Sequence, residues 1–180
     1  MAINTILSTK VTDTGTEPIT TAQAKLHASI DYSDYDTILP IYISAARMAV
    51  EKCTGYALVE KTVKHTANLK AHVPFQLTYS PVKQFNYAIQ DYSQLGQEYG
   101  LNSDTGLNFG SNGEVLMVDL DGIYDIEYKA GFDTVPADLK LAVLQMFTFI
   151  FNHRGEYSEG KLDISVEAER IVRNVSRFAI

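Results

Sequence analysis

The spacing of hydrophobic and polar residues predicts helices towards both ends of the chain and strands in its middle. A first short helix is expected over Thr21–Ala28, because Thr20 and Gln23 have the spacing of a capping box. A second helix is expected to end near Cys53, where Gly55 suits the left-handed residue that follows many helices. Residues 1–17 are polar and rich in threonine, and they predict no definite element.

The second helix has two alternative starting points. It begins either near Ser33, where Pro40 would remove a hydrogen bond and kink the first turns, or after a cap at Thr37, where Pro40 costs little. On a helical wheel this helix has one wide apolar side and one polar side, here called the wet side, which is expected to face solvent. Ordinary packing of the apolar side into the core explains this pattern. The apolar side holds Ile38, Ile41, Ala45, Met48, Ala49 and Val50, and the wet side holds Ser44, Arg47 and Glu51.

Residues 58–130 change to strand-like segments separated by turn residues. Asp121-Gly122 is the clearest turn, and a type I′ hairpin there would pair Leu120 with Ile123 and Val118 with Asp125. The stretch Asp91–Gly110 is rich in Gly, Ser and Asn and is expected to be a long loop. The predicted strands are Val59–Leu69, Phe75–Tyr79, Phe85–Gln90, Glu114–Leu120 and Ile123–Tyr128.

A third helix, opened by Pro136, is apolar almost all the way round. A small domain normally buries one stripe of a helix, and each large apolar side chain left exposed forgoes about 1.5–3 kcal/mol. We therefore expect other copies of the chain, or another protein, to cover the remaining sides. One stripe holds Leu139, Val143, Met146 and Ile150, and the predicted subunit contacts on the other sides are Leu141, Leu144, Phe149 and Phe151.

A last helix is expected over Ser165–Phe178, after a polar linker at Gly155–Lys161. One side would hold Ile171, Val172, Val175 and Phe178, and the opposite side Arg170, Arg173 and Arg177. Together the elements predict an α+β fold, a small bundle of three to four helices with an antiparallel β-region inserted between the second and third helices. The expected organisation is a single domain over residues 1–180, with a β-rich insertion at about 58–130 and a C-terminal helical tail at 162–180.

Composition narrows the classes of function. The net charge of −7 argues against tight binding to nucleic acid, which needs clustered Lys and Arg at the phosphates. No apolar run reaches the ~20 residues that span a bilayer. The first residues lack the pattern of a signal peptide, so we expect synthesis in the cytoplasm. The single cysteine, Cys53, lies near a helix end on the apolar side and is expected to be a buried thiol rather than a nucleophile.

The residues that carry chemistry show no catalytic pattern. The four histidines, His27, His65, His72 and His153, lack metal-ligand spacing and are interpreted as surface residues. The acids around the Asp121-Gly122 turn do not oppose one another in the hairpin register, so they are interpreted as solubilising charge. We therefore expect no catalytic residue, no metal and no cofactor.

Three segments match the sequence pattern of a known protein family in their order and spacing as well as in residue type. They are Pro18-Ile19-Thr20 with Ala24-Lys25, then Ile41–Leu58 with its Thr-Gly-x-x-Leu ending, and then Tyr128-Lys129-Ala130-Gly131-Phe132, Val135-Pro136-Ala137-Asp138-Leu139-Lys140 and Asn152-His153-Arg154. Together they resemble the head–tail connector (adaptor) proteins of long-tailed double-stranded DNA phages.

The resemblance implies a structural protein of the virion neck, made in the host cytoplasm. Such connectors form a ring, typically of twelve subunits, below the portal protein, and double-stranded DNA passes through the lumen without specific binding. The ring presents a platform to a stopper or tail-completion protein, and no membrane is involved. The resemblance assigns portal binding to the last helix, through Arg170, Ile171, Arg173, Val175, Arg177 and Phe178. The alternatives are a stopper or tail-completion protein of the neck, and a small hydrolase whose site the spacing does not reveal.

Overall fold

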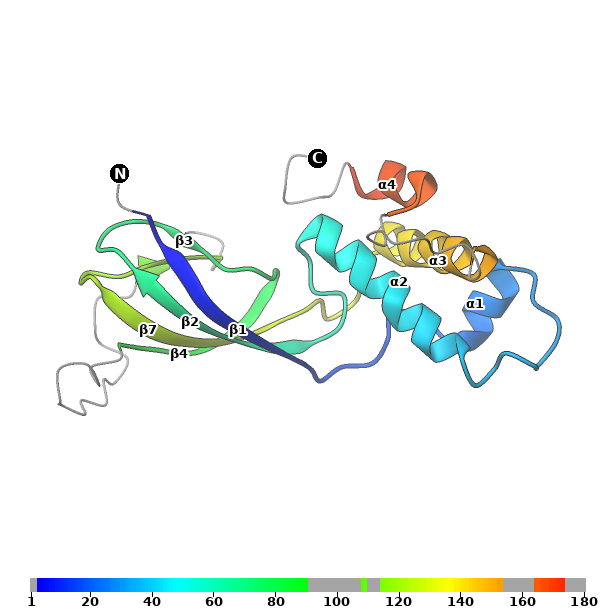
Figure 1. Cartoon of the computed structure of the whole chain (residues 1–180), viewed down its shortest axis with the longest axis horizontal. Helices are drawn as coiled ribbons and strands as arrows, with labels where there is room; N and C mark the ends of the chain where they lie inside the picture. The colour runs from blue at the N-terminus through cyan, green and yellow to red at the C-terminus, as the bar shows by residue number, and fades with distance from the viewer. Residues whose placement is uncertain (1–2, 91–107, 110–113, 154–163, 174–180) are drawn as a thin grey trace. The chain divides into compact units, whose positions relative to one another are not determined.

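The chain divides into two compact units, one built of antiparallel sheets and the other of helices (Figure 1). The computed structural model describes residues 3–90, 108–109, 114–153 and 164–173. The β unit comprises residues 1–15 and 60–131, and the helical unit comprises residues 16–59 and 132–180. The predicted α+β class, with a β-region between the second and third helices, is confirmed.

The β unit contains two antiparallel sheets. The four-stranded sheet has the order β1-β2-β7-β4, and the three-stranded sheet has the order β3-β6-β5. In β2 the odd-numbered residues are buried and the even-numbered ones are partly or fully exposed, as expected for a strand with one face in a core. The strands are β1 (Thr5–Asp13), β2 (Lys61–Leu69), β3 (Phe75–Gln76), β4 (Val82–Gln90), β5 (Asn108–Phe109), β6 (Val115–Met117) and β7 (Gly122–Ala130).

The buried face of the four-stranded sheet carries the core of the β unit. The ring of Phe75, from β3, lies 6.1 Å from that of His65, which places the smaller sheet over this face. We call it the inner face; its buried members include Val63, His65, Ala67, Ala88, Tyr124, Ile126, Tyr128 and Ala130.

One expectation for the β-region is wrong. The hairpin at Asp121-Gly122 does not form, because β7 pairs with β2 and β4 while β6 pairs with β3 and β5. Asp125 accordingly lies opposite Thr66 and Ile89 instead of Val118. The N-terminal residues, for which the sequence predicted no element, form the edge strand β1. Of the loop expected over Asp91–Gly110, β5 is described as a strand, and residues 91–107 and 110 lie outside the described residues.

The helices follow local signals closely. The capping box at the start of the first helix is present, since the N–H of Gln23 donates to Thr20 Oγ1 at 3.2 Å and the N–H of Thr20 donates to Gln23 Oε1 at 2.9 Å. The second helix begins late enough to hold Pro40 in its first turn, and it ends at Gly55, whose φ is 73°. The helices are α1 (Thr21–His27), α2 (Leu39–Thr54), α3 (Ala137–Asn152) and α4 (Val166–Val172).

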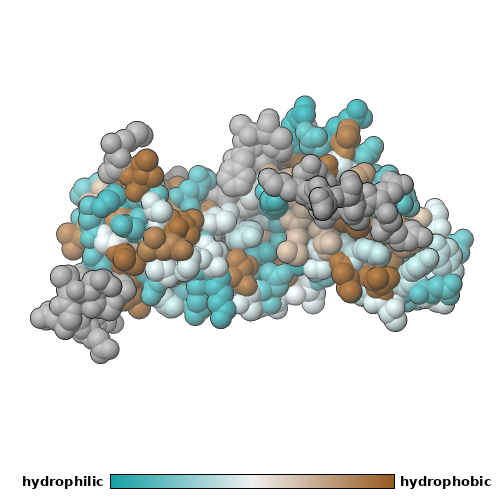
Figure 2. Space-filling model, in the orientation of Figure 1, coloured by the Kyte–Doolittle hydropathy of each residue, from teal (hydrophilic) through white to brown (hydrophobic). Residues whose placement is uncertain are grey.

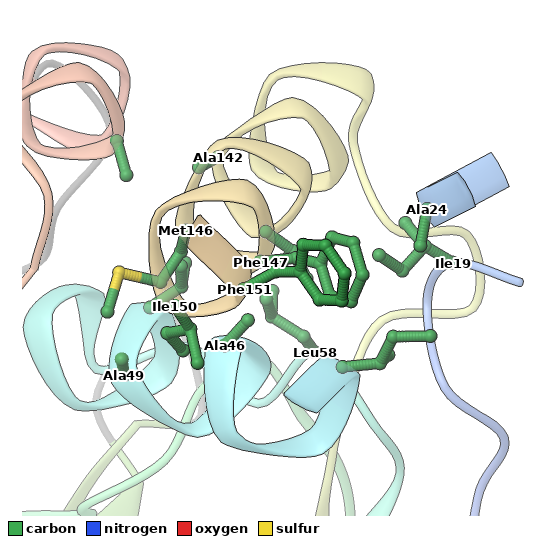
Figure 3. Packing of buried hydrophobic residues seen from close by; sticks show 14 of the residues in the cluster. Ile19, Ala24, Ala46, Ala49, Leu58, Ala142, Met146, Phe147, Ile150 and Phe151 are labelled. Atoms are coloured by element: carbon green, nitrogen blue, oxygen red, sulfur yellow. The ribbon is translucent and has the colours of Figure 1, made fainter. Parts of the chain in front are cut away.

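The core of the helical unit lies where α2 and α3 pack side by side, with α4 and α1 against α3 (Figure 3). The rings of Phe147 and Phe151 stack with centroids 6.0 Å apart, and Met146 and Ile150 point between the helices. The small residues Ala46 and Ala142 are fully buried and allow the close approach of their helices. Among the described residues, no helix is long and apolar enough to cross a membrane.

Candidate functional site: the assembly surfaces

The second helix carries an exposed apolar stripe opposite its buried side. Ile41 and Met48, seven residues apart and so on the same face of α2, are 65% and 59% exposed, and Ile38 beside them is partly exposed. The face that packs into the core is formed by Leu39, Ile43, Ala46 and Val50. Single exposed apolar side chains are common, but three along one helical stripe provide a surface that a partner can bury.

The sequence predicted the sides of α2 incorrectly. Arg47 and Glu51, assigned to the wet side, are almost fully buried, while Ile41 and Met48, assigned to the core, are exposed. The guanidinium Nε of Arg47 donates to Glu17 Oε2 at 2.9 Å, and its Nη1 donates to Glu51 Oε2 at 2.7 Å. Because these groups satisfy one another, two ionised side chains are accommodated inside the unit. The cluster supports the fold and presents no group to a substrate.

The four predicted subunit contacts on α3 occupy different environments. Leu141 is 42% exposed, and Leu144 and Phe149 are partly buried and pack against the core. Phe151 is only 4% exposed, so the premise that another copy must cover it is wrong. Its ring makes edge contacts with Tyr35 at 5.6 Å and Tyr42 at 6.2 Å, which cover it within its own unit.

The predicted portal-binding residues are described only in part. Arg170 and Arg173 are exposed on the surface at the end of α4, and Arg173 Nη2 donates to Glu169 Oε1 at 3.1 Å. Ile171 is partly buried and packs against the helical core. The remaining three residues, Val175, Arg177 and Phe178, lie outside the described residues.

Figure 2 shows apolar side chains at the surface of both units, interspersed with polar ones. In the β unit the exposed apolar residues include Ile3, Ile6, Leu7 and Val11 of the N-terminal segment, which the sequence had not singled out. The signal that could have found them is a two-residue alternation: Thr9 and Val11 lie opposite inner-face residues of β2, and Ser8 and Lys10 lie opposite outer ones. Ile6 belongs with Thr9 and Val11, but an irregularity in the pairing between Ile6 and Ser8 interrupts the alternation at Leu7. Among the residues that the structure describes, exposed apolar surface is therefore a feature that both units share.

Several titratable residues in the described part of the β unit are engaged in structural contacts. Lys64 forms an ion pair with Glu127, whose carboxylate also accepts from Asn86 Nδ2 at 2.6 Å, and these hydrogen bonds lower the pKa of Glu127. The backbone N–H of Ala71, at 2.7 Å, and then Lys70 hold the pKa of the Asp121 carboxyl below its usual value. Within the described part of the chain, no group of three or more His, Cys, Asp or Glu side chains is placed to hold a metal ion.

One histidine contradicts its interpretation as a surface residue. His65 is 1% exposed, with Nδ1 2.9 Å from Thr9 Oγ1 and Nε2 3.1 Å from Thr78 Oγ1. Burial lowers the pKa of the imidazole, because the charged form loses its hydration. Since both ring nitrogens are occupied by threonine hydroxyls, His65 joins β1 to the interior of the β unit, and neither nitrogen is open to a substrate.

The sequence from residue 17 to residue 162 matches the family model described as head completion protein. The chain belongs to the head completion protein family. This confirms the resemblance to phage head–tail connector proteins that the three sequence segments carried. No curated protein shows a match to the chain.

Solved structures share the fold of this head completion protein at low sequence identity. A chain in the structure titled the neck of an empty GTA particle computed with C6 symmetry is 15% identical, with a TM-score of 0.66, over 95% of this chain and 97% of that one. A chain of the virion of a native gene transfer agent (GTA) particle is 16% identical, with a TM-score of 0.68, over 94% and 96% of the two chains. A chain in the neck of a native GTA particle computed with C12 symmetry is 17% identical, with a TM-score of 0.61, over 90% and 94%.

Proposed function

We propose that this head completion protein forms a ring of twelve subunits below the portal protein, where it joins the filled head to the tail and extends the DNA channel. The observation that carries the proposal is the match to the head completion family over residues 17–162. The likeness of fold to chains from particle necks computed with C6 and C12 symmetry supports a place in a ring at the virion neck.

The helical unit offers surfaces suited to contacts between neighbouring subunits. A ring requires a heterologous interface, in which one patch on a subunit meets a different patch on the next. The stripe of Ile41 and Met48 on α2 and the side chain of Leu141 on α3 provide apolar surface outside the protomer core. We assign the subunit contact to these residues, with Leu144 and Phe149 contributing their exposed parts.

Portal binding is assigned to the C-terminal segment. Arg170 and Arg173 are exposed cations at the end of α4, and Ile171 is partly exposed next to them. Val175, Arg177 and Phe178 follow in the sequence and complete the proposed contact. The other face of the ring would receive a stopper or tail-completion protein. The net charge of −7 suits a channel through which DNA passes without being gripped.

The proposed role is structural, with no catalytic step and no cofactor. It is supported by the family match and by the ion pairs and hydrogen bonds that engage Glu127, Asp121 and His65. Hydrolysis would need a nucleophile or an activated water next to a base that reaches the substrate, and His65 is instead enclosed between two threonine hydroxyls.

The test is the mass of the full-length chain alone, with the purified portal and with tail components, followed by imaging of any ring. We expect a ring on the portal, and we expect Leu141→Glu to reduce its formation while Lys52→Glu, at another exposed position of the helical unit, does not. Binding to tail components without the portal would instead assign the protein to the stopper or tail-completion class. A chain that binds neither would contradict the proposal.

A further inference from the structure

The first strand is an edge strand that is exposed along its whole length. All nine residues of β1 are exposed, and among the described strands only β2 pairs with it. At the other edge of the sheet lies β4, also nine residues long and paired only with β7 among the described strands. Soluble proteins usually shorten, charge or cover such edges, because an open edge is a template for pairing with another strand.

The main-chain groups on the outer edge of β1 follow from its hydrogen bonding to β2. The N–H of Thr14 donates to the carbonyl of Glu60 at 2.8 Å, which makes these two residues a hydrogen-bonded pair of the antiparallel ladder. Along the strand the direction of the backbone groups alternates, so Lys10 and Thr12 point towards β2 while Thr9 and Val11 point away from it.

The same reasoning identifies the outer groups of β4. The N–H of Gly131 donates to the carbonyl of Pro81 at 2.9 Å, so the next pair along the ladder, Val82 and Ala130, is not hydrogen-bonded. Ile126 lies an even number of residues from Ala130 on β7, so the backbone groups of these two residues point in the same direction. Ala88 of β4 lies opposite Ile126, and this pair is therefore not hydrogen-bonded either. Val82 and Ala88 therefore direct their backbone groups away from β7.

Both edges also carry apolar side chains on the same face of the sheet. Ile6 and Val11 of β1 lie opposite Ala67 and Val63, on the inner face, and are 44% and 37% exposed. On β4, the inner face continues through Val82 and Phe85, which lie opposite Ala130 and Tyr128 and are partly exposed. Joining the two edges would continue one apolar face across the joint and bury these side chains.

The directions of the strands show that the two edges of one sheet suit pairing between neighbouring copies of the chain. Every pairing in the order β1-β2-β7-β4 is antiparallel, so β1 and β4 run in opposite directions. If copies are related by rotation about a ring axis, the β4 edge of one copy meets the β1 edge of the next as another antiparallel pair. An odd number of strands would have forced a parallel joint there, which is slightly less stable per residue.

We propose that the β units of neighbouring subunits join by antiparallel main-chain pairing of β4 in one copy with β1 in the next, which makes one continuous sheet through the ring. This inference rests on the ring proposed above and adds to it the strands that form the second contact. Pairing through the main chain tolerates change in the side chains, because the backbone supplies the hydrogen bonds.

Amide hydrogen exchange on the full-length chain, dissociated and assembled into rings, tests the pairing residue by residue. The amides of Thr9, Val11, Val82 and Ala88 should exchange quickly in the dissociated chain and become protected in the ring. Lys10 and Thr12, which point to β2, should be protected in both states. Fast exchange at the four outer amides in the ring would overturn the strand joint while leaving the ring intact, and their protection in the dissociated chain would show an intramolecular partner instead.

Protection of Thr9 and Val11 without Val82 and Ala88, in a particle of two copies, would mean a two-fold β1–β1 joint and would contradict both the joint and the ring. A chain that forms no assembly with or without the portal would refute the ring and the joint together. These outcomes separate failure of the inference from failure of the proposed function.

A proline variant gives an independent measurement. Val11→Pro removes an N–H that points out of the edge and leaves the hydrogen bonds to β2 in place, so the fold should persist. We expect it to lower ring formation about tenfold or more, while the matched control Val11→Ile, which keeps both the N–H and an apolar β-branched side chain, assembles like the parent. Normal assembly of a correctly folded Val11→Pro chain would overturn the inference, and the exchange measurement decides the matter if that variant does not fold.

Discussion

Arg47 Nη1 donates to Glu51 Oε2 at 2.7 Å, one turn apart on α2, and both side chains are buried inside the helical unit. The other carboxylate oxygen of Glu51 accepts from the N–H of Leu58 at 2.7 Å and of Val59 at 3.3 Å. Arg47 also reaches Glu17, which precedes α1 in the sequence. One buried ion pair therefore ties three segments of the helical unit together, the approach to α1, α2 itself and the segment that follows it.

Removing one member of this pair should be strongly destabilising. Glu51→Ala leaves the Arg47 guanidinium with one fewer buried partner and the N–H groups of Leu58 and Val59 without their acceptor. We expect the free energy of unfolding of the helical unit to fall by about 3–5 kcal/mol. Urea unfolding followed by far-ultraviolet circular dichroism measures the change.

The fourth helix supplies the matched control. Glu169 and Arg173 have the same one-turn spacing and are 3.1 Å apart, but the pair is exposed to water. Glu169→Ala should therefore change the free energy of unfolding by less than about 1 kcal/mol. An equal decrease in the free energy of unfolding for Glu51→Ala and Glu169→Ala would show that the buried ion pair contributes no more to stability than the exposed one.

Substitutions of two apolar residues of α3 should distinguish a residue that packs in the core from one that contacts a neighbouring subunit. Phe151→Ala removes a ring that packs on Phe147, Tyr35 and Tyr42, and it should lower the free energy of unfolding by about 3–5 kcal/mol. Leu141→Ala, at an exposed position, should cost about 0.5 kcal/mol or less but should weaken ring formation. Unfolding curves and the mass of the assembled species are measured on both variants. A ring unaffected by Leu141→Ala would remove this residue from the interface.

Local signals in the sequence predicted the helices well. The capping box of Thr20 and Gln23 and the left-handed Gly55 depend on residues within four positions of each other, so the sequence contains all the information needed. The start at Pro136 and the apolar stripe of Leu139, Val143, Met146 and Ile150 also lie in their predicted places. Short-range hydrogen bonding and helical periodicity account for this success.

Contacts between distant segments explain what the sequence did not reveal. Polarity placed Arg47 on the wet side of α2, because its partner Glu17 lies 30 residues away and helical periodicity does not show it. The Asp121-Gly122 turn suggested a hairpin, but β7 instead pairs along nine residues with β2, which is far longer than the three-residue β6. Of the candidate contact residues, Leu141 is exposed and Phe151 is covered by aromatic side chains that precede it by more than 100 positions.

His65 should make the stability of the β unit depend on pH. Burial lowers its pKa in the folded state from the ordinary value of 6.5, so the unfolded chain takes up the proton at a higher pH than the folded chain. The stabilisation is therefore fully present above pH 6.5 and is lost as the pH falls through the lower pKa of the folded state. Urea unfolding at several pH values should show a midpoint that decreases below this pH.

Replacement of His65 by Gln should remove this part of the pH dependence, even if the variant is less stable throughout. The control is His72→Asn, because His72 is exposed and Asn tolerates its φ of 58°. The control should keep the pH dependence of the parent chain. If the urea midpoint decreased equally at low pH in both variants, the pH dependence would belong to groups other than His65.

The exposed arginines of the last helix should control portal binding and not folding. Changing Arg170, Arg173 and Arg177 to Glu reverses three charges, two of which lie on the described surface of α4. We expect weaker binding to the portal, with a smaller dependence of affinity on salt, since exposed charges act through screened attraction. The matched variant with Lys at the same positions keeps the charges and should bind nearly as the parent does. Light scattering with purified portal, at two salt concentrations, measures both variants, and unchanged binding of the Glu variant would exclude the arginines from the contact.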